Sequence, residues 1–158
     1  MVRAESGWFM DYRNSDGSIS EMCGNGVRVF ARYLADHEGE SFPIAVHTRD
    51  GVKVVHDAGA GLLTVEMGSP EVLGMTEVGS AGRRWEAKHI SMGNPHAVAF
   101  VDDLRDAGDL LREPDFDAAI YPDGVNVEFV VRRGEQHVAM RVHERGAGET
   151  RSCGTGAC

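Results

Sequence analysis

One short pattern occurs twice in the chain, near its beginning and near its end. The letters MCGNG at residues 22–26 return as SCGTG at residues 152–156, and in each copy a short alternating segment precedes the loop. An internal repeat constrains a fold strongly, because each copy forms the same structural unit. We therefore expect two similar lobes, residues 1–80 and 81–158, that face each other across a cleft and each present one cysteine sulfur.

The composition limits the classes of protein and partner. A chain of 158 residues with 42% hydrophobic residues can form one domain or two small lobes that share a core. A net charge of −9 argues against nucleic acid as a partner, and no apolar run approaches the roughly 20 residues of a membrane span. Residues 1–13 show no secretion signal, and three cysteines are too few for a disulfide scaffold. These features favour a reducing, cytoplasmic location.

Local patterns predict a strand, a turn and a helix around the first cysteine loop. Residues 8–13 alternate as in a strand, and residues 14–17 (NSDG) are typical of a turn. Residues 27–34 predict a helix that ends near Gly39. Because apolar residues lie on most sides of this helix, we expect other elements to surround it.

The rest of the chain predicts β-structure and one further helix. Asp50-Gly51 is typical of a hairpin turn, and a helix over residues 104–111 could be capped by Asp102 or Asp103. The expected strands are short apolar runs bounded by turn signals. They cover residues 44–48, 52–56, 62–67, 71–78, 85–92, 97–101, 125–132 and 138–144.

A cysteine followed by Gly-x-Gly at the start of a helix favours a defined chemistry. Unpaired backbone N–H groups and the positive end of the helix dipole stabilise the thiolate and lower the thiol pKa towards neutrality. The same N–H groups bind anions, and the glycines let a carboxylate approach the backbone closely. Two such loops on opposite sides of an amino acid could invert its α-carbon, because one thiolate would remove the proton and the other thiol would deliver one.

Other roles for the cysteines are open at this point. A lone cysteine is more often a small buried residue than a catalyst, and a disulfide between Cys23 and Cys153 would need oxidising conditions. The spacing of Cys153 and Cys158 and the isolated positions of His96 and His143 do not form a paired zinc motif. We therefore expect no metal.

Several motifs in order along the chain resemble the diaminopimelate epimerase family. They are residues 14–18 (NSDGS), 22–26 (MCGNG), 93–96 (GNPH), Asn126, 144–150 (ERGAGET) and 153–156 (CGTG). The resemblance covers nearly the whole chain, and residues 144–150 are its most specific part. Residues 10–13 and 123–128 are similar to actinobacterial members. Proline racemases share the paired cysteines, but they typically have His at the position of Asn25.

The resemblance implies an α/β fold with two similar lobes, each a sheet wrapped around a central helix. It also implies a homodimeric, cofactor-independent enzyme of lysine and peptidoglycan biosynthesis, which interconverts the LL and meso forms of its small-molecule substrate, 2,6-diaminoheptanedioate. Cys23 and Cys153 would be the acid–base thiols, with His96 and Glu144 modulating their pKa. The implied substrate-binding residues are Gly24, Asn25, Gly154 and Thr155 at the reacting carboxylate, and Asn14, Asn94, Asn126, Glu144 and Arg145 at the distal end.

The sequence leaves two alternatives to this function. The chain could be a related two-thiol racemase, such as one of the proline racemase type, or an inactive remnant that only binds ligand. Family members have a further N-terminal segment and complete the second central helix, so we expect a chain truncated at both ends with an incomplete second lobe. Taken alone, Asn14 could be an ordinary turn residue, His96 an exposed loop residue, and Glu144 with Arg145 a solvent-facing pair.

Overall fold

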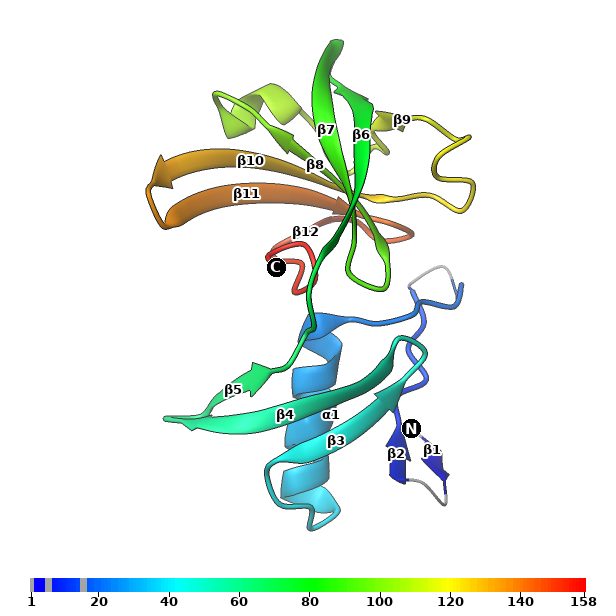
Figure 1. The fold of residues 1–158 in the computed structure, drawn as a ribbon, viewed down its shortest axis with the longest axis vertical. Coiled ribbons are helices and arrows are strands. Elements are labelled where there is room, and N and C mark those ends of the chain that lie inside the picture. Colours follow the sequence, from blue (N-terminus) through cyan, green and yellow to red (C-terminus); the bar gives the residue numbers. More distant parts are fainter. Residues whose placement is uncertain (1, 5–6, 15–16) are drawn as a thin grey trace. The chain divides into compact units, whose positions relative to one another are not determined.

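The computed structural model describes residues 2–4, 7–14 and 17–158, and these form two compact units, Met1–Gly68 and Ser69–Cys158. Each unit contains one β-sheet with both parallel and antiparallel neighbours (Figure 1). The predicted α/β class is confirmed. The sequence-based boundary near residue 80 falls at the end of β6 (Glu71–Ser80), which pairs with β7 (Arg83–Ser91) and so belongs to the second unit.

The first unit packs a helix against a five-stranded sheet. The strands follow the order β1 (Val2–Ala4), β2 (Gly7–Phe9), β3 (Ile44–Thr48), β4 (Gly51–Gly59) and β5 (Leu62–Val65). Only the pair β2–β3 is parallel. The predicted hairpin turn is confirmed, because β3 and β4 pair directly and Gly51 has φ 83°, a conformation that glycine adopts without strain.

Helix α1 (Gly24–His37) lies across β3, β4 and β5 (Figure 1). It buries Val27, Ala31 and Leu34 completely, which places one stripe of the helix on the sheet. Val29 is 71% exposed and Tyr33 is 40% exposed. The prediction that other elements surround this helix on most sides is therefore wrong for the described residues, since the sheet covers only one side.

The core of the first unit joins this stripe to the sheet and to the segment before the helix. Its buried hydrophobic members are Trp8, Met10, Met22, Val27, Ala31, Leu34, Ile44, Val46 and Val55. Met22, which precedes the first cysteine, is only 2% exposed and anchors the loop. The packing of this core thus holds the loop at the N-terminus of α1.

The second unit is a seven-stranded sheet. Its order is β12 (Gly148–Thr150), β11 (His137–Glu144), β10 (Asn126–Gly134), β8 (Pro95–Phe100), β7, β6 and β9 (Asp115–Phe116). Strands β8 and β10 are parallel, and their register places Asn126 opposite His96. One face of β10 contributes Val127, Phe129 and Val131 to the hydrophobic core. The other face carries the buried polar residues of the candidate site.

The predicted helix over residues 104–111 is wrong in type and length, because the chain forms only a 3-10 helix, η1 (Leu104–Ala107). Asp103 caps it as expected, and its Oδ1 accepts a hydrogen bond of 2.9 Å from the Arg105 N–H. The element ends at Gly108, whose φ of 63° leaves the helical region.

An arginine on β11 ties η1 to β12. The Arg141 guanidinium donates to the carbonyls of Leu104 and Gly108 at 3.0 and 2.8 Å, and to both carboxylate oxygens of Glu149 at 2.7 and 2.9 Å. Glu149 belongs to the ERGAGET block at residues 144–150. This bidentate pair gives that motif residue a structural role within the unit.

The described part of the second unit contains no α-helix, and its last residues form a turn after Cys153. Among the helices that the structure describes, none has the length and apolar character needed to cross a membrane.

Candidate active site

Cys23 is the N-cap residue of helix α1, directly before its first residue, Gly24. Its backbone is extended, with φ −138° and ψ 113°, and its Sγ accepts a hydrogen bond of 3.3 Å from the Gly26 N–H. Its carbonyl accepts the first helical bond, 2.9 Å from the Val27 N–H. The sulfur therefore takes the place of the usual oxygen cap and satisfies one of the N–H groups that a helix leaves unpaired.

Cys153 repeats this arrangement in the second unit. Its Sγ accepts a hydrogen bond of 3.4 Å from the Gly156 N–H, and its carbonyl accepts one of 3.2 Å from the Ala157 N–H. The same two partners follow the cysteine at the same spacing as in the first loop. The sequence repeat is thus also a repeat of local backbone geometry.

The Cys153 sulfur lies in a buried environment. The residue is 5% exposed, and its Sγ is 3.3 Å from the Thr155 hydroxyl oxygen. Burial is the largest cause that raises the pKa of the Cys153 thiol, and the carboxylates of Glu144 and Glu128 also raise it; against the donors Thr155 and Gly156, which lower it, the pKa reaches about 11. The prediction of a lowered thiol pKa is therefore wrong for Cys153, because desolvation outweighs the donors.

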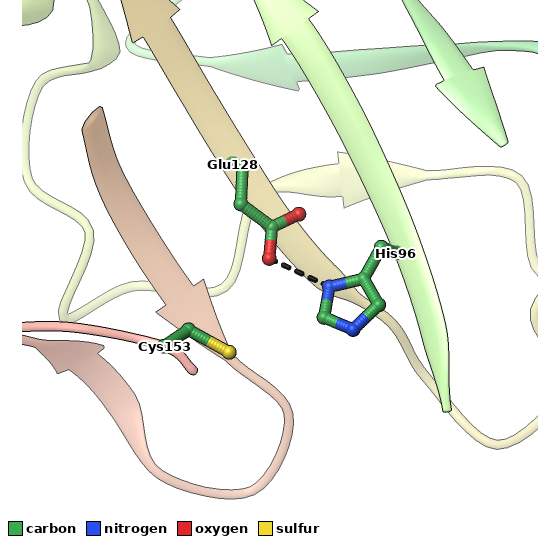
Figure 2. Close-up of side chains that lie close together, drawn as sticks. All are labelled: His96, Glu128 and Cys153. Atoms are coloured by element: carbon green, nitrogen blue, oxygen red, sulfur yellow. Dashed lines mark hydrogen bonds and ion pairs between the residues drawn. The ribbon is translucent and has the colours of Figure 1, made fainter. Parts of the chain in front are cut away.

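A chain of hydrogen bonds connects this sulfur to a buried carboxylate. His96 Nδ1 lies 2.7 Å from Glu128 Oε1 (Figure 2). His96 Nε2 lies 3.0 Å from Asn94 Oδ1. The Asn94 amide nitrogen donates to Thr155 Oγ1 at 3.3 Å, and Thr155 contacts the Cys153 sulfur. Each of these five residues is at most 7% exposed. His96 is only 1% exposed, so it is not an exposed loop residue.

Sequence reasoning did not assign a role to Glu128. The residue is fully buried, and the largest effect on the pKa of its carboxyl group is the upward shift caused by burial, while His96 lowers it. A signal was present, because Glu128 is a carboxylate inside an apolar run and lies two residues after Asn126, on the same face of the strand.

The same cluster offers three side chains of metal-binding type. Ligand atoms of His96, Glu128 and Cys153 all lie within 4.8 Å of one another (Figure 2). Both nitrogens of His96 already make hydrogen bonds, to Glu128 and Asn94. A cation at this position would have to replace one of these bonds, so the observed geometry is that of a hydrogen-bonded network.

Four of the five residues expected at the distal end of a substrate lie in the second unit, where β8 and β10 begin and β11 ends; they are Asn94, Asn126, Glu144 and Arg145. The Asn126 side chain donates to the Pro95 carbonyl at 3.0 Å and accepts from the Arg145 backbone N–H at 3.0 Å. Glu144 accepts a hydrogen bond from the Thr150 hydroxyl. The amide of Asn126 therefore fixes the backbone on which Arg145 is presented.

Three further predicted site residues belong to the first unit, one before the cysteine and two directly after it. Asn14 pairs with Ser18, because its Nδ2 donates to Ser18 Oγ at 3.0 Å and its backbone N–H donates to the Ser18 carbonyl at 2.9 Å. Residues 15 and 16 of the predicted turn lie outside the described residues. In the first turn of α1, Asn25 Oδ1 accepts from the Arg28 guanidinium, and Gly24 is buried.

The structure thus brings together one group of the predicted site residues in the second unit and another in the first. The second-unit group shares the polar network or its immediate surroundings and comprises Asn94, His96, Asn126, Glu144, Arg145, Cys153, Gly154 and Thr155. The first-unit group lies at or before the start of α1 and comprises Asn14, Cys23, Gly24 and Asn25.

The fold and its two cysteine loops define an α/β protein built from two units that each present a thiol at a capped turn. A sequence model described as diaminopimelate epimerase matches residues 2–73 and 89–158. The chain belongs to the diaminopimelate epimerase family.

Curated relatives agree with this assignment. The chain is 64% identical to a diaminopimelate epimerase of Streptomyces coelicolor, over 99% of this chain and 55% of the relative. It is 51% identical to one of Rhodococcus erythropolis and 47% identical to one of Mycolicibacterium gilvum, over 98% and 97% of this chain and 56% of each relative. The chain therefore spans about half the length of the curated relatives that it matches.

Proposed function

We propose that this chain provides the two thiols of a cofactor-independent epimerase that interconverts LL- and meso-2,6-diaminoheptanedioate. The observation that carries the proposal is the matched geometry of Cys23 and Cys153. Each sulfur accepts the N–H of the glycine three residues on, and each carbonyl accepts the N–H one residue further. Packing alone does not require a cysteine at both positions, whereas proton transfer between two thiols does. The names of the relatives supply the substrate.

In the proposed reaction, one cysteine removes the α-proton as a thiolate. The C–H bond breaks, its electron pair stays on the α-carbon and spreads into the neighbouring carboxylate, and an S–H bond forms. The second cysteine delivers its thiol proton to the opposite face, so that a new C–H bond forms with inverted configuration. The two sulfurs exchange roles when the direction of the reaction changes.

Backbone N–H groups in the two loops would hold the reacting carboxylate. We assign this role to Gly24 and Asn25 at the start of α1, where the helix dipole favours negative charge, and to Gly154 and Thr155 in the second loop. Charge that develops on the carboxylate during proton removal would then meet oriented donors, which lowers the barrier without a cofactor.

The protonation state of Cys153 fits one half of this cycle. A pKa of about 11 leaves the group as a thiol at neutral pH, which is the form that donates a proton. The Thr155 hydroxyl and the Gly156 N–H then stabilise the thiolate that results. In the proposal, Glu144 and His96 bias this ionisation, since the Glu144 carboxylate raises the pKa of Cys153 and His96 belongs to the network that reaches Thr155.

The distal amino-acid end of the substrate would bind to Asn14, Asn94, Asn126, Glu144 and Arg145. The planar guanidinium of Arg145 suits a carboxylate, and Glu144 suits an ammonium group. Asn126 supports this assignment because its side chain accepts from the Arg145 backbone and so positions the arginine.

The chemistry also has consequences for compartment and assembly. Both thiols must stay reduced, so we propose that the protein works in the cytoplasm, in lysine and peptidoglycan biosynthesis. By family resemblance we propose a homodimer with a small molecule as its only substrate. Light scattering of the purified protein would measure the assembly state.

The direct test is deuterium incorporation at the α-carbon of LL-diaminopimelate by this chain, in heavy water with a reductant. Incorporation should disappear in Cys23→Ala and in Cys153→Ala, and it should persist in Cys158→Ala, a matched control at an exposed cysteine. L-Proline as the comparison substrate should show no exchange. A folded chain that exchanges L-proline but not diaminopimelate would point to the racemase alternative, and binding without any exchange would point to an inactive remnant.

A further inference from the structure

Glu128 is a buried acidic residue to which the proposed reaction assigns no role. It lies in β10, is 0% exposed, and within the described part of the chain its Oε2 has no hydrogen-bond partner. Burying a carboxylate in this way opposes folding unless its partners compensate. Among the described residues, the side chain that forms a hydrogen bond with Glu128 is His96, at 2.7 Å. Because the burial of Glu128 costs stability, we expect this residue to have a function in the polar network around Cys153.

The carboxylate of Glu128 also lies against the second cysteine loop. A Cβ atom at position 156 would lie only 2.3 Å from Glu128 Oε1, so any residue other than glycine would require the Glu128 side chain or the loop to shift. Gly156 is the residue whose N–H donates to the Cys153 sulfur. Glu128 is therefore in contact with both routes to the sulfur, one through His96 and the other through the loop backbone.

The hydrogen bonds between Glu128 and the sulfur have a direction. The Asn94 amide oxygen can only accept, so the His96 Nε2 that faces it carries a hydrogen. The Asn94 amide nitrogen in turn donates to Thr155 Oγ1. Since the Thr155 oxygen already accepts this bond, its own hydrogen is available to the Cys153 sulfur at 3.3 Å.

We propose that Glu128 is a positioning residue for Cys153. By holding His96 in the state that donates to Asn94, it keeps the Thr155 hydroxyl directed at the sulfur and so stabilises the thiolate. A glutamine at this position would fill the same space, but its amide could either donate to His96 or accept from it. The hydrogen on His96 Nε2 would then no longer be enforced, and the Asn94 amide could turn and draw the Thr155 hydrogen away.

Charge effects in the cluster work against this stabilisation but are smaller. Among the described residues, the charged or titratable groups that interact with Glu128 are His96 on β8, Glu144 on β11, Cys153 in the loop and the buried Tyr121, whose phenol pKa the Glu128 carboxylate raises. With one proton shared between His96 and Glu128, the pair is neutral overall, and its field at the sulfur is that of a dipole. The loss of a hydrogen bond to a charged acceptor therefore decides the sign.

The test measures the rate at which iodoacetamide alkylates Cys153, read by mass spectrometry of its peptide. At pH about 8 the rate follows the small thiolate fraction. Glu128→Gln should slow alkylation of Cys153 about tenfold, the size expected for one hydrogen bond to a charged acceptor. Cys23 in the same sample is the internal reference, and Glu86→Gln, an exposed glutamate on β7, is the matched control. Cys23 in the Glu128→Gln variant and Cys153 in the Glu86→Gln variant should both be alkylated at the wild-type rate.

A double-mutant cycle separates this role from simple packing. Thr155→Val removes the hydroxyl through which Glu128 is proposed to act, so adding Glu128→Gln to it should produce no further slowing. An unchanged or faster rate in Glu128→Gln, or slowing that adds in full to that of Thr155→Val, would overturn the proposal. If Glu128→Gln does not fold, Glu128→Met, which is apolar and of similar size, must show the same slowing.

The catalytic meaning of this inference rests on the proposed function, but its test needs no substrate. Alkylation could show the coupling while deuterium exchange fails, and the network would then stand without the epimerase assignment. Exchange could equally succeed while alkylation is unaffected by Glu128→Gln. In that case the epimerase would stand, and the role of Glu128 would be rejected.

Discussion

Gly156 packs directly against the carboxylate of Glu128, and a Cβ atom at this position would lie 2.3 Å from Oε1. Glu128 is fully buried and hydrogen-bonded to His96, so moving its carboxylate aside would disturb that bond. The close approach of Glu128 on β10 therefore favours glycine at position 156. This reason is separate from any need for a ligand to approach the loop backbone.

Gly156→Ala should lower the free energy of unfolding by about 1–3 kcal/mol, the usual cost of an overpacked buried site. Urea-induced unfolding of the chain would measure it. Gly134→Ala is the matched control, because its Cβ would meet only His137 Cβ at an ordinary 3.7 Å. Equal losses in the two variants would contradict the close packing at Gly156.

Alkylation of Cys153 should be slow at neutral pH and should accelerate in alkali. Burial raises the pKa of this thiol from 9.0 to about 11. Below that pKa each unit of pH increases the thiolate fraction about tenfold, so the rate should rise in this proportion and level off near pH 11. A stopped-flow or mass-spectrometric pH series would record the profile. A plateau reached near pH 8 would show that the helix-like turn outweighs burial.

Two substitutions at Cys23 should separate its structural role from its proposed chemistry. Cys23→Ala removes the sulfur that caps α1 and should cost about 1 kcal/mol of stability, whereas Cys23→Ser keeps a capping acceptor and should cost only a few tenths. Both should abolish deuterium exchange. Urea unfolding and the exchange assay together check this, and equal stability losses would argue against the cap.

Two valines on helix α1 should respond very differently to truncation. Val27 is fully buried against the sheet, and Val27→Ala should cost about 2 kcal/mol through lost burial and the cavity that it leaves. Val29 is 71% exposed, and Val29→Ala should change stability by less than about 0.5 kcal/mol. Thermal or urea unfolding of both variants checks the comparison. If both substitutions lowered the free energy of unfolding by the same amount, Val29 would have to be buried in solution, which would contradict the exposure seen here.

Much of the local structure could be predicted from the residues alone. The hairpin at Asp50-Gly51 and the cap at Asp103 depend on neighbours within a few positions, and both are confirmed. The helix expected over residues 104–111 failed because Gly108 and the polar contacts of Arg141 hold only a short 3-10 turn. Arg141 lies more than thirty positions away in the sequence, beyond the reach of local patterns.

The sequence by itself determined the repeated cysteine loops, the presence of a helix after the first of them and the family, since each depends on residue types at short, fixed spacings. Only the tertiary structure decided that His96 pairs with Glu128 and that Cys153 is a buried thiol with a raised pKa. The physical reason is that hydrogen bonding and desolvation depend on which strands are neighbours. The parallel pairing of β8 with β10 places His96 beside residues some thirty positions further along the chain.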